Sequence, residues 1–211
     1  MKFFDKAAAY RVIPVIAIDD VNQALPLADA LIEGGLPIAE VTFRTEAAAA
    51  VMRLIARERP EIILGAGTIL KPEQIAVAQE CGAVFGVAPG LNPRVLAEAQ
   101  RLGFEFVPGV ANPSDVELGL ELGCRVLKLF PAEVVGGVKM ISALSAAYGH
   151  TGVKFMPTGG VTPANLPDYL KLKTVAAAGG TWLAKKEDMA AGNWSQIVAN
   201  CRAVVEQVKG L

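Results

Sequence analysis

Lys128 lies inside a short run of otherwise apolar residues, 126–131, whose composition is typical of a buried β-strand. Burial removes water from the charged ammonium group and so favours the neutral amine, which is a nucleophile. Such an amine can form a Schiff base with a ketone. The alternative is a lysine whose stem packs against the core while its head group reaches solvent at the strand end. Other residues of the chain are needed to choose between these interpretations.

Glu40 and Arg44 bracket the end of another predicted strand, with Arg44 just beyond it, and their side chains could complete such a site. Schiff-base chemistry needs a group that moves protons, and a carboxyl group such as Glu40 can do this. Glu40 could equally be an ion-pair partner of Lys128 or Arg44. The planar guanidinium of Arg44 suits a substrate carboxylate, to which Thr68 could add a hydroxyl group.

Two glycine pairs, Gly159-Gly160 and Gly179-Gly180, follow the last two predicted strands. Glycine lets backbone N–H groups approach an anion closely, and a following helix N-terminus favours negative charge. Thr181 adds a hydroxyl group next to the second pair. A single pair would indicate no more than a tight turn. Two pairs at neighbouring strand ends favour a phosphate site.

The chain repeats one structural unit that could bring these residues together. Short apolar runs alternate with helical segments, and the turns between them carry glycine, with proline at the first helical turn. These prolines are Pro72, Pro93, Pro113 and Pro163, and the expected N-caps are Asn92, Asn112 and Thr162. The expected strands lie near 12–18, 37–42, 61–65, 83–87, 104–107, 124–130, 153–157 and 174–178.

Eight such units predict an α/β fold, a single (β/α)8 TIM barrel with an N-terminal helical extension, as one domain over residues 1–211. In such a barrel the C-terminal strand ends meet at one mouth, where Lys128 and Glu40 would converge. Lys154 stands early in its strand, where a structural role is expected. Glu133 comes after Pro131 and should turn away on the next loop.

Composition argues against several classes of function. The formal net charge is −1 with acids and bases scattered, so neither a nucleic-acid footprint nor a polybasic membrane patch is visible. No apolar run is long enough to span a bilayer, and the first ten residues lack the features of a signal peptide. The three separated cysteines and the single histidine, His150, disfavour a disulfide framework, a zinc site and a histidine-centred triad. We expect a cytoplasmic protein with no metal and no cofactor.

Six segments, taken in order, resemble the bacterial aldolases for 2-keto-3-deoxy-6-phosphogluconate (KDPG) and 4-hydroxy-2-oxoglutarate (KHG). They are EVTFRT at 40–45, GAGT at 65–68, PG at 89–90, KLFPAE at 128–133, PTGG at 157–160 and GGTW at 179–182. The resemblance covers nearly the whole chain. It implies a class I, metal-independent aldehyde-lyase in which Lys128 forms the Schiff base and Glu40 is the general acid and base.

The resemblance also implies roles for the other candidates. Arg44 and Thr68 would bind the carboxylate of pyruvate, while Pro89 and Phe130 would shape the cavity. The residues expected at the phosphate end are Gly159, Gly160, Gly179, Gly180 and Thr181. The chain departs from the common family pattern at Phe43, Leu129 and Thr181, where leucine, phenylalanine and serine are usual. None of these changes removes a group that the mechanism needs.

The family cleaves KDPG to pyruvate and glyceraldehyde 3-phosphate, and KHG to pyruvate and glyoxylate, and its members are usually homotrimers. The resemblance therefore implies a small keto-acid sugar phosphate as substrate and a homotrimer as the assembly. Three alternatives stay open at this point. They are an aldolase for the galactonate epimer of the substrate, a phosphate-binding barrel isomerase or synthase, and a sensor that binds a sugar phosphate without consuming it.

Overall fold

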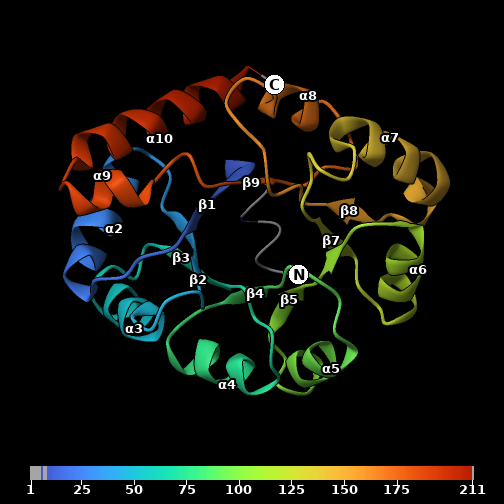
Figure 1. Cartoon of the computed structure of the whole chain (residues 1–211), viewed down its shortest axis with the longest axis horizontal. Helices are drawn as coiled ribbons and strands as arrows, with labels where there is room; N and C mark the ends of the chain where they lie inside the picture. The colour runs from blue at the N-terminus through green and yellow to red at the C-terminus, as the bar shows by residue number, and fades with distance from the viewer. Residues whose placement is uncertain (1–5, 7–8, 211) are drawn as a thin grey trace.

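The computed structural model describes residue 6 and residues 9–210 of the chain. Strands and helices alternate along most of the chain, and the paired strands run parallel. Figure 1 shows the strands around the centre of the molecule with the helices outside them. The first strand, β1 (Val12–Ile16), is buried at every position. Both faces of such a strand are covered, which explains the continuous apolar runs in the sequence.

The other strands are β2 (Ile38–Thr42), β3 (Ile63–Gly67), β4 (Phe85–Val87), β5 (Glu105–Val107), β6 (Gly109–Val110), β7 (Val126–Leu129), β8 (Lys154–Phe155) and β9 (Ala178–Gly180). The helices are α2 (Ala24–Glu33), α3 (Ala48–Glu58), α4 (Glu73–Glu80), α5 (Pro93–Arg101), α6 (Pro113–Glu121), α7 (Gly137–Tyr148), α8 (Leu166–Leu170), α9 (Lys186–Ala190) and α10 (Trp194–Lys209). Two short 3-10 helices, η1 (Val21–Gln23) and η2 (Gly149–Thr151), complete the order.

The strands form two sheets, and the prediction of a closed eight-stranded TIM barrel is wrong. A six-stranded sheet has the order β5-β4-β3-β2-β1-β9, and a three-stranded sheet has the order β6-β7-β8. The α/β class and the alternation of strands with helices are as predicted. The continuous ladder of hydrogen bonds that would close a barrel is interrupted at two places.

Pro108 causes the first interruption, because proline has no N–H group to give to a strand ladder. The same stretch of chain pairs with β4 before this proline and with β7 after it. Val107 lies opposite Val87, and Gly109 lies opposite Lys128. The apolar run at 104–107 indicates a strand, but nothing in it marks the change of partner.

The second interruption lies between β8 and β9. β8 contains only two residues, and Pro157, which also lacks an N–H group, follows soon after it. Isolated bridges join Phe155 to Val175 and Thr158 to Gly179 in place of a ladder. The two sheets are thus neighbours at this position without forming one sheet.

The last predicted strand, at 174–178, is wrong in its limits. β9 begins at Ala178 and pairs with β1, with Val12 opposite Ala178. Gly179 and Gly180 therefore belong to a strand, whereas the sequence predicts a turn after one. Glycine is a poor strand former, so only pairing with a buried neighbouring strand makes this segment extended.

Two helices, α5 and α6, begin at the predicted prolines. Their N-caps are Asn92 and Asn112, whose side chains accept hydrogen bonds from backbone N–H groups two and three residues later. The predicted helix start at Pro163 is wrong. Thr162 N–H donates to Asn165 Oδ1 at 2.7 Å and closes a turn, and α8 begins only after this turn.

The predicted N-terminal helical extension falls mainly on residues 1–5 and 7–8, which lie outside the described part of the chain. Within the described part, no helix is both long and apolar enough to cross a membrane.

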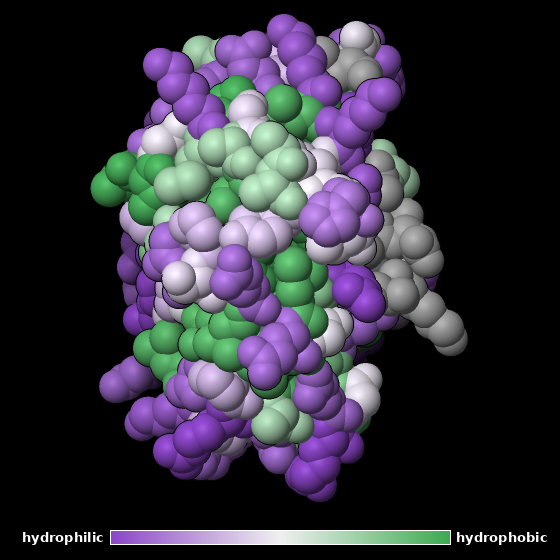
Figure 2. Space-filling view, turned by 90° about the vertical axis from the view of Figure 1, so that its right-hand side faces the viewer, coloured by the Kyte–Doolittle hydropathy of each residue, from purple (hydrophilic) through white to green (hydrophobic). Residues whose placement is uncertain are grey.

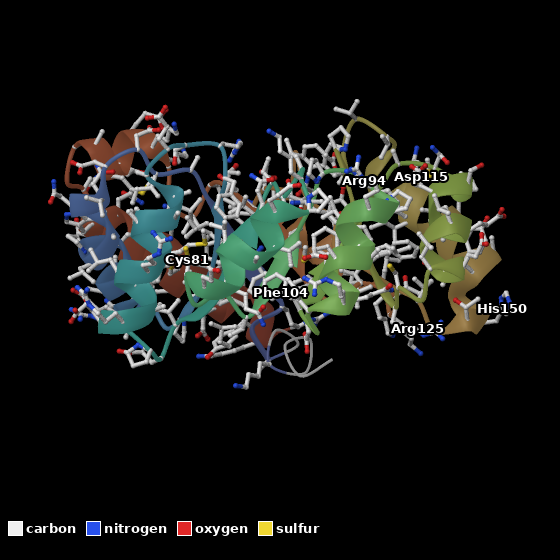
Figure 3. All side chains as sticks on the ribbon, turned by 90° about the horizontal axis from the view of Figure 1, so that it is seen from below. Cys81, Arg94, Phe104, Asp115, Arg125 and His150 are labelled. Carbon is white, nitrogen blue, oxygen red and sulfur yellow. The ribbon has the colours of Figure 1, made fainter. Side chains whose placement is uncertain are left out.

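Figure 3 distinguishes the two edges of the molecule. Arg94 and Asp115, near the starts of α5 and α6, lie toward one edge, and Arg125 and His150 lie toward the other. Since these two helices begin just after the strands have ended, the first edge carries C-terminal strand ends. The single histidine is exposed in η2 on the opposite edge.

Candidate active site

Lys128 and Glu40 meet in the interior between the two sheets. Lys128 lies in β7 and Glu40 in β2. They are 5 % and 0 % exposed, and Lys128 Nζ lies 3.2 Å from Glu40 Oε1. The structure therefore brings the two residues together, as the sequence predicts. Lys128 Nζ also lies 5.6 Å from the centre of the Phe130 ring, within reach of a cation–π interaction.

Two buried side-chain oxygen atoms, one of Glu40 itself and one of Thr158, lack a hydrogen-bond partner. Within the described residues, Glu40 Oε2 and Thr158 Oγ1 are the buried side-chain polar atoms in this condition. An unpaired buried polar atom is costly and calls for an explanation. Both residues line the same cavity as Lys128. Polar groups of a bound ligand would satisfy these atoms.

Two glycines leave the space that these side chains occupy. A Cβ atom on Gly67, in β3, would lie 2.3 Å from Glu40 Oε1. A Cβ atom on Gly179, in β9, would lie 2.4 Å from Thr158 Oγ1. Any larger residue at either position would push a polar group of the site away. The strand pairings thus set the position of the polar atoms.

Arg44 is held at the mouth of the site by Thr42. The buried hydroxyl of Thr42 donates to the carbonyl oxygen of Ile16 at 2.9 Å and accepts a hydrogen bond from Arg44 Nε at 3.1 Å. Only Nε of the guanidinium is engaged in this contact, so its terminal nitrogens can still donate to an anion.

Thr68 follows β3 in a conformation that is rare for a residue with a side chain. Its φ angle is 57°, in the left-handed region. The turn after it is held by Gln74, whose Oε1 accepts from the backbone N–H groups of Leu70 and Lys71 at 2.7 and 3.0 Å. Strained backbone of this kind is concentrated at functional sites, where the surrounding structure maintains it.

A cavity of about 180 Å³ connects these groups. Eight of the predicted site residues line it: Glu40, Arg44, Thr68, Pro89, Lys128, Phe130, Gly159 and Thr181. Val15, Thr42 and Thr158 also line it. The other predicted residues, Gly160, Gly179 and Gly180, are not among the lining residues; the latter two are buried in β9.

Thr158 is one of three lining residues, with Val15 and Thr42, that were not among the predicted site residues. It stands between Pro157 and the first glycine pair, in a segment already singled out for its glycines. Its place at the end of a predicted strand was a usable signal. Two other residues lie as predicted: Lys154 is exposed, with Nζ donating to the carbonyl oxygen of Lys173 at 2.9 Å, and Glu133 is outside the cavity lining.

A lysine and a carboxylate buried together in a cavity of an α/β fold are the groups that a lyase of the Schiff-base class requires. Residues 5–200 match the family model described as KDPG and KHG aldolase. The chain belongs to this family.

Individual relatives agree over almost the full length of the chain. The 2-dehydro-3-deoxy-phosphogluconate aldolase of Haemophilus influenzae is 43 % identical over 208 residues, covering 99 % of this chain and 97 % of the relative. The KHG/KDPG aldolase of Escherichia coli K12 is 42 % identical over 198 residues, covering 94 % and 92 %.

A solved structure with a similar chain is the KDPG aldolase of Legionella pneumophila, in which pyruvate was captured at low pH as a covalent carbinolamine intermediate. It is 40 % identical to this chain, with a TM-score of 0.90, and the match covers 93 % of this chain and 95 % of that one. The covalent pyruvate is a property of that protein.

Proposed function

We propose that the protein cleaves 2-keto-3-deoxy-6-phosphogluconate to pyruvate and glyceraldehyde 3-phosphate, and 4-hydroxy-2-oxoglutarate to pyruvate and glyoxylate, as a class I aldolase. The observation that carries this proposal is the buried contact of 3.2 Å between Lys128 Nζ and Glu40 Oε1, beside an open cavity. Membership in the KDPG and KHG aldolase family supports it. The reaction uses side chains alone and needs no metal or cofactor.

The first half of the reaction forms an iminium ion on Lys128. Its neutral amine attacks the C2 ketone of the substrate, and a proton moves from nitrogen to oxygen to give a carbinolamine. Glu40 takes up and returns protons in this step, because one of its oxygens contacts the amine and the other has no partner within the described residues. Protonation of the C2 hydroxyl group then lets it leave as water.

The second half breaks the carbon–carbon bond. A base removes the proton of the C4 hydroxyl group, the bond between C3 and C4 breaks, and its electron pair moves into the iminium system. The aldehyde product leaves and an enamine remains on Lys128. Protonation at C3 and attack of water at C2 release pyruvate and restore the free amine.

The anionic ends of the substrate define roles for the other residues. Arg44 and Thr68 would hold the carboxylate, while Gly159 and Thr181 face the same cavity and would hold the phosphate end together with Gly160. Gly179 and Gly180 remain predicted members of this end. The N–H group of Gly179 donates to the carbonyl oxygen of Pro157 at 2.8 Å. Its contribution would therefore be the space that it leaves for Thr158.

The proposal includes a cytoplasmic homotrimer of single-domain chains. The three cysteines are buried and unpaired, which fits a reducing compartment. The described residues form one continuous apolar core cluster, which fits one domain. Figure 2 shows the side that carries α6 and α7, where apolar residues lie among charged ones. Val134 is 83 % exposed and Leu118 is 37 % exposed, and such side chains would suit an interface between subunits.

Incubation with pyruvate and sodium borohydride tests the central step. Reduction of the Schiff base should add a pyruvyl-derived group to Lys128, located by peptide mapping. The folded Lys128→Ala variant should show no adduct and no cleavage activity. An adduct on Lys154 would overturn the assignment of the lysine, and no adduct on the folded wild-type protein would overturn the mechanism.

A further inference from the structure

A buried tyrosine donates a hydrogen bond to a carboxylate that lies next to the turn formed by Gly159 and Gly160. Tyr169, in α8, is 0 % exposed, and its hydroxyl group donates a hydrogen bond to Glu133 Oε1. Burial, followed by this hydrogen bond, raises the pKa of Tyr169, so the phenol keeps its proton. The contact links α8 to the loop between β7 and α7. Neither residue lines the cavity that contains Lys128.

Glu133 contacts the glycine turn through both its backbone and its side chain. Its N–H group donates to the carbonyl oxygen of Gly159 at 3.0 Å. A Cβ atom on Gly160 would lie 2.5 Å from Glu133 Cγ, and one on Gly137 would lie 2.8 Å from Glu133 Oε1. The side chain therefore fills the space between the turn and the start of α7.

The turn itself is built from residues that do not fix their own conformation. Gly159 and Gly160 have φ angles of 94° and 84°, a region that glycine enters easily and leaves easily. Asn165 Nδ2 donates to the carbonyl oxygen of Gly160 at 3.1 Å. With Glu133 on one side and Asn165 on the other, the turn is held from two directions. Ordering it before the substrate arrives reduces the entropy lost on binding.

We propose that Glu133 and Tyr169 are positioning residues that fix the Gly159-Gly160 turn for the phosphate end of the substrate. This inference rests on the proposed function. The pair acts on the distal end of the substrate and not on the amine of Lys128. Its loss should therefore weaken binding of phosphorylated substrates and leave the pyruvate half-reaction intact.

The variant Tyr169→Phe removes one hydroxyl group and tests this proposal. We expect KM for 2-keto-3-deoxy-6-phosphogluconate to rise by about tenfold, the scale of one lost hydrogen bond to a charged group, with kcat changed by less than about twofold. Exchange of the methyl protons of pyruvate with deuterated water, followed by NMR, needs the Schiff base but no phosphate. Its rate should stay at the wild-type value.

Matched variants separate positioning from general stability. Tyr148→Phe removes a tyrosine–glutamate hydrogen bond of the same type, 2.9 Å long, to Glu117 on the exterior of the molecule, and should change neither rate nor KM. Glu133→Ala, at an exposed position, should raise KM as Tyr169→Phe does. Glu133→Gln keeps an acceptor for the tyrosine hydroxyl and should restore KM to near the wild-type value.

Several results would overturn the proposal. One is an unchanged KM in the folded Tyr169→Phe and Glu133→Ala variants. Another is a parallel loss of pyruvate exchange and cleavage, since that would show a general structural role. Failure of Glu133→Gln to restore KM would overturn the role of the hydrogen bond. An absence of pyruvate exchange in the wild-type protein would overturn the proposed function, and this proposal with it.

Discussion

At the scale of single residues, burying Lys128 and Glu40 together costs free energy of folding. Taking each charge out of water costs roughly several kcal/mol, and such pairs can often be replaced by apolar residues without loss of stability. A pair that served the fold alone would also need no cavity and no unpaired oxygen next to it. Glu40 Oε2 and the cavity are both present. The pair is therefore better explained by proton transfer than by stability.

Glu40→Gln tests this explanation at the same scale. Glutamine has the same shape and can still accept a hydrogen bond from Lys128, but it cannot take up a proton. We expect kcat for cleavage to fall by about 10²- to 10⁴-fold, the usual contribution of a general acid and base. Pyruvate release can be followed through NADH oxidation by lactate dehydrogenase. As a control, Lys154→Gln changes an exposed lysine outside the cavity and should retain full activity. A kcat near the wild-type value in Glu40→Gln would contradict the role of Glu40 in proton transfer.

At the scale of elements, the packing of β3 against β2 fixes the position of the carboxylate. In their register Glu40 lies opposite Gly65, and Thr42 lies opposite Gly67. The side chain of Glu40 extends past Gly67, where a Cβ atom would be 2.3 Å from Oε1 and 2.8 Å from Cγ. A glycine in a strand usually weakens it. Here the glycine makes room for the carboxylate of Glu40, to which we assign the proton transfer in our proposal.

Gly67→Ala should therefore damage the site more than the fold. We expect kcat to fall by about 10²-fold, since a shift of the carboxylate by about 1 Å can cost this much, and the free energy of unfolding to fall by about 1–3 kcal/mol. Cleavage kinetics and urea unfolding would measure the two effects. Gly90→Ala is a matched control in the loop after β4, because a Cβ atom there meets nothing within 4 Å. Equal losses in both variants would contradict the steric argument.

The sequence predicts an element correctly where residues close in the chain determine its limits. It fails where pairing with a distant strand determines them. The caps Asn92 and Asn112 act within their own helix turns, so their residue types are sufficient. Lys128 and Glu40 are 88 residues apart, but both lie in the C-terminal halves of their predicted strands, and the rule that the C-terminal strand ends converge brings them together. The limits of β9 depend on pairing with β1, which no local pattern of glycines can indicate.

At the scale of the whole molecule, the site depends on a core that also buries thiols. Cys124 precedes β7 and Cys201 lies in α10, and they are 7 % and 0 % exposed. Burial raises the pKa of Cys124 to about 11 and that of Cys201 to about 12, from an ordinary value of 9.0. Between pH 9.0 and these raised pKa values, the thiols of the folded protein keep their protons, whereas those of the unfolded chain lose them. Stability must then fall as the pH rises above 9.

Urea unfolding at about pH 8 and about pH 10 measures this effect, since only the second condition ionises the thiols of the unfolded chain. We expect a lower free energy of unfolding at the higher pH. Cys201→Ala removes one of the buried thiols, so its stability should fall less between the two conditions. Met189→Leu is a control for core substitution, because it changes a buried residue that does not titrate and should keep the wild-type dependence. If Cys201→Ala also keeps the wild-type dependence, the loss of stability at alkaline pH arises from other groups, and the Cys201 thiol has no part in it.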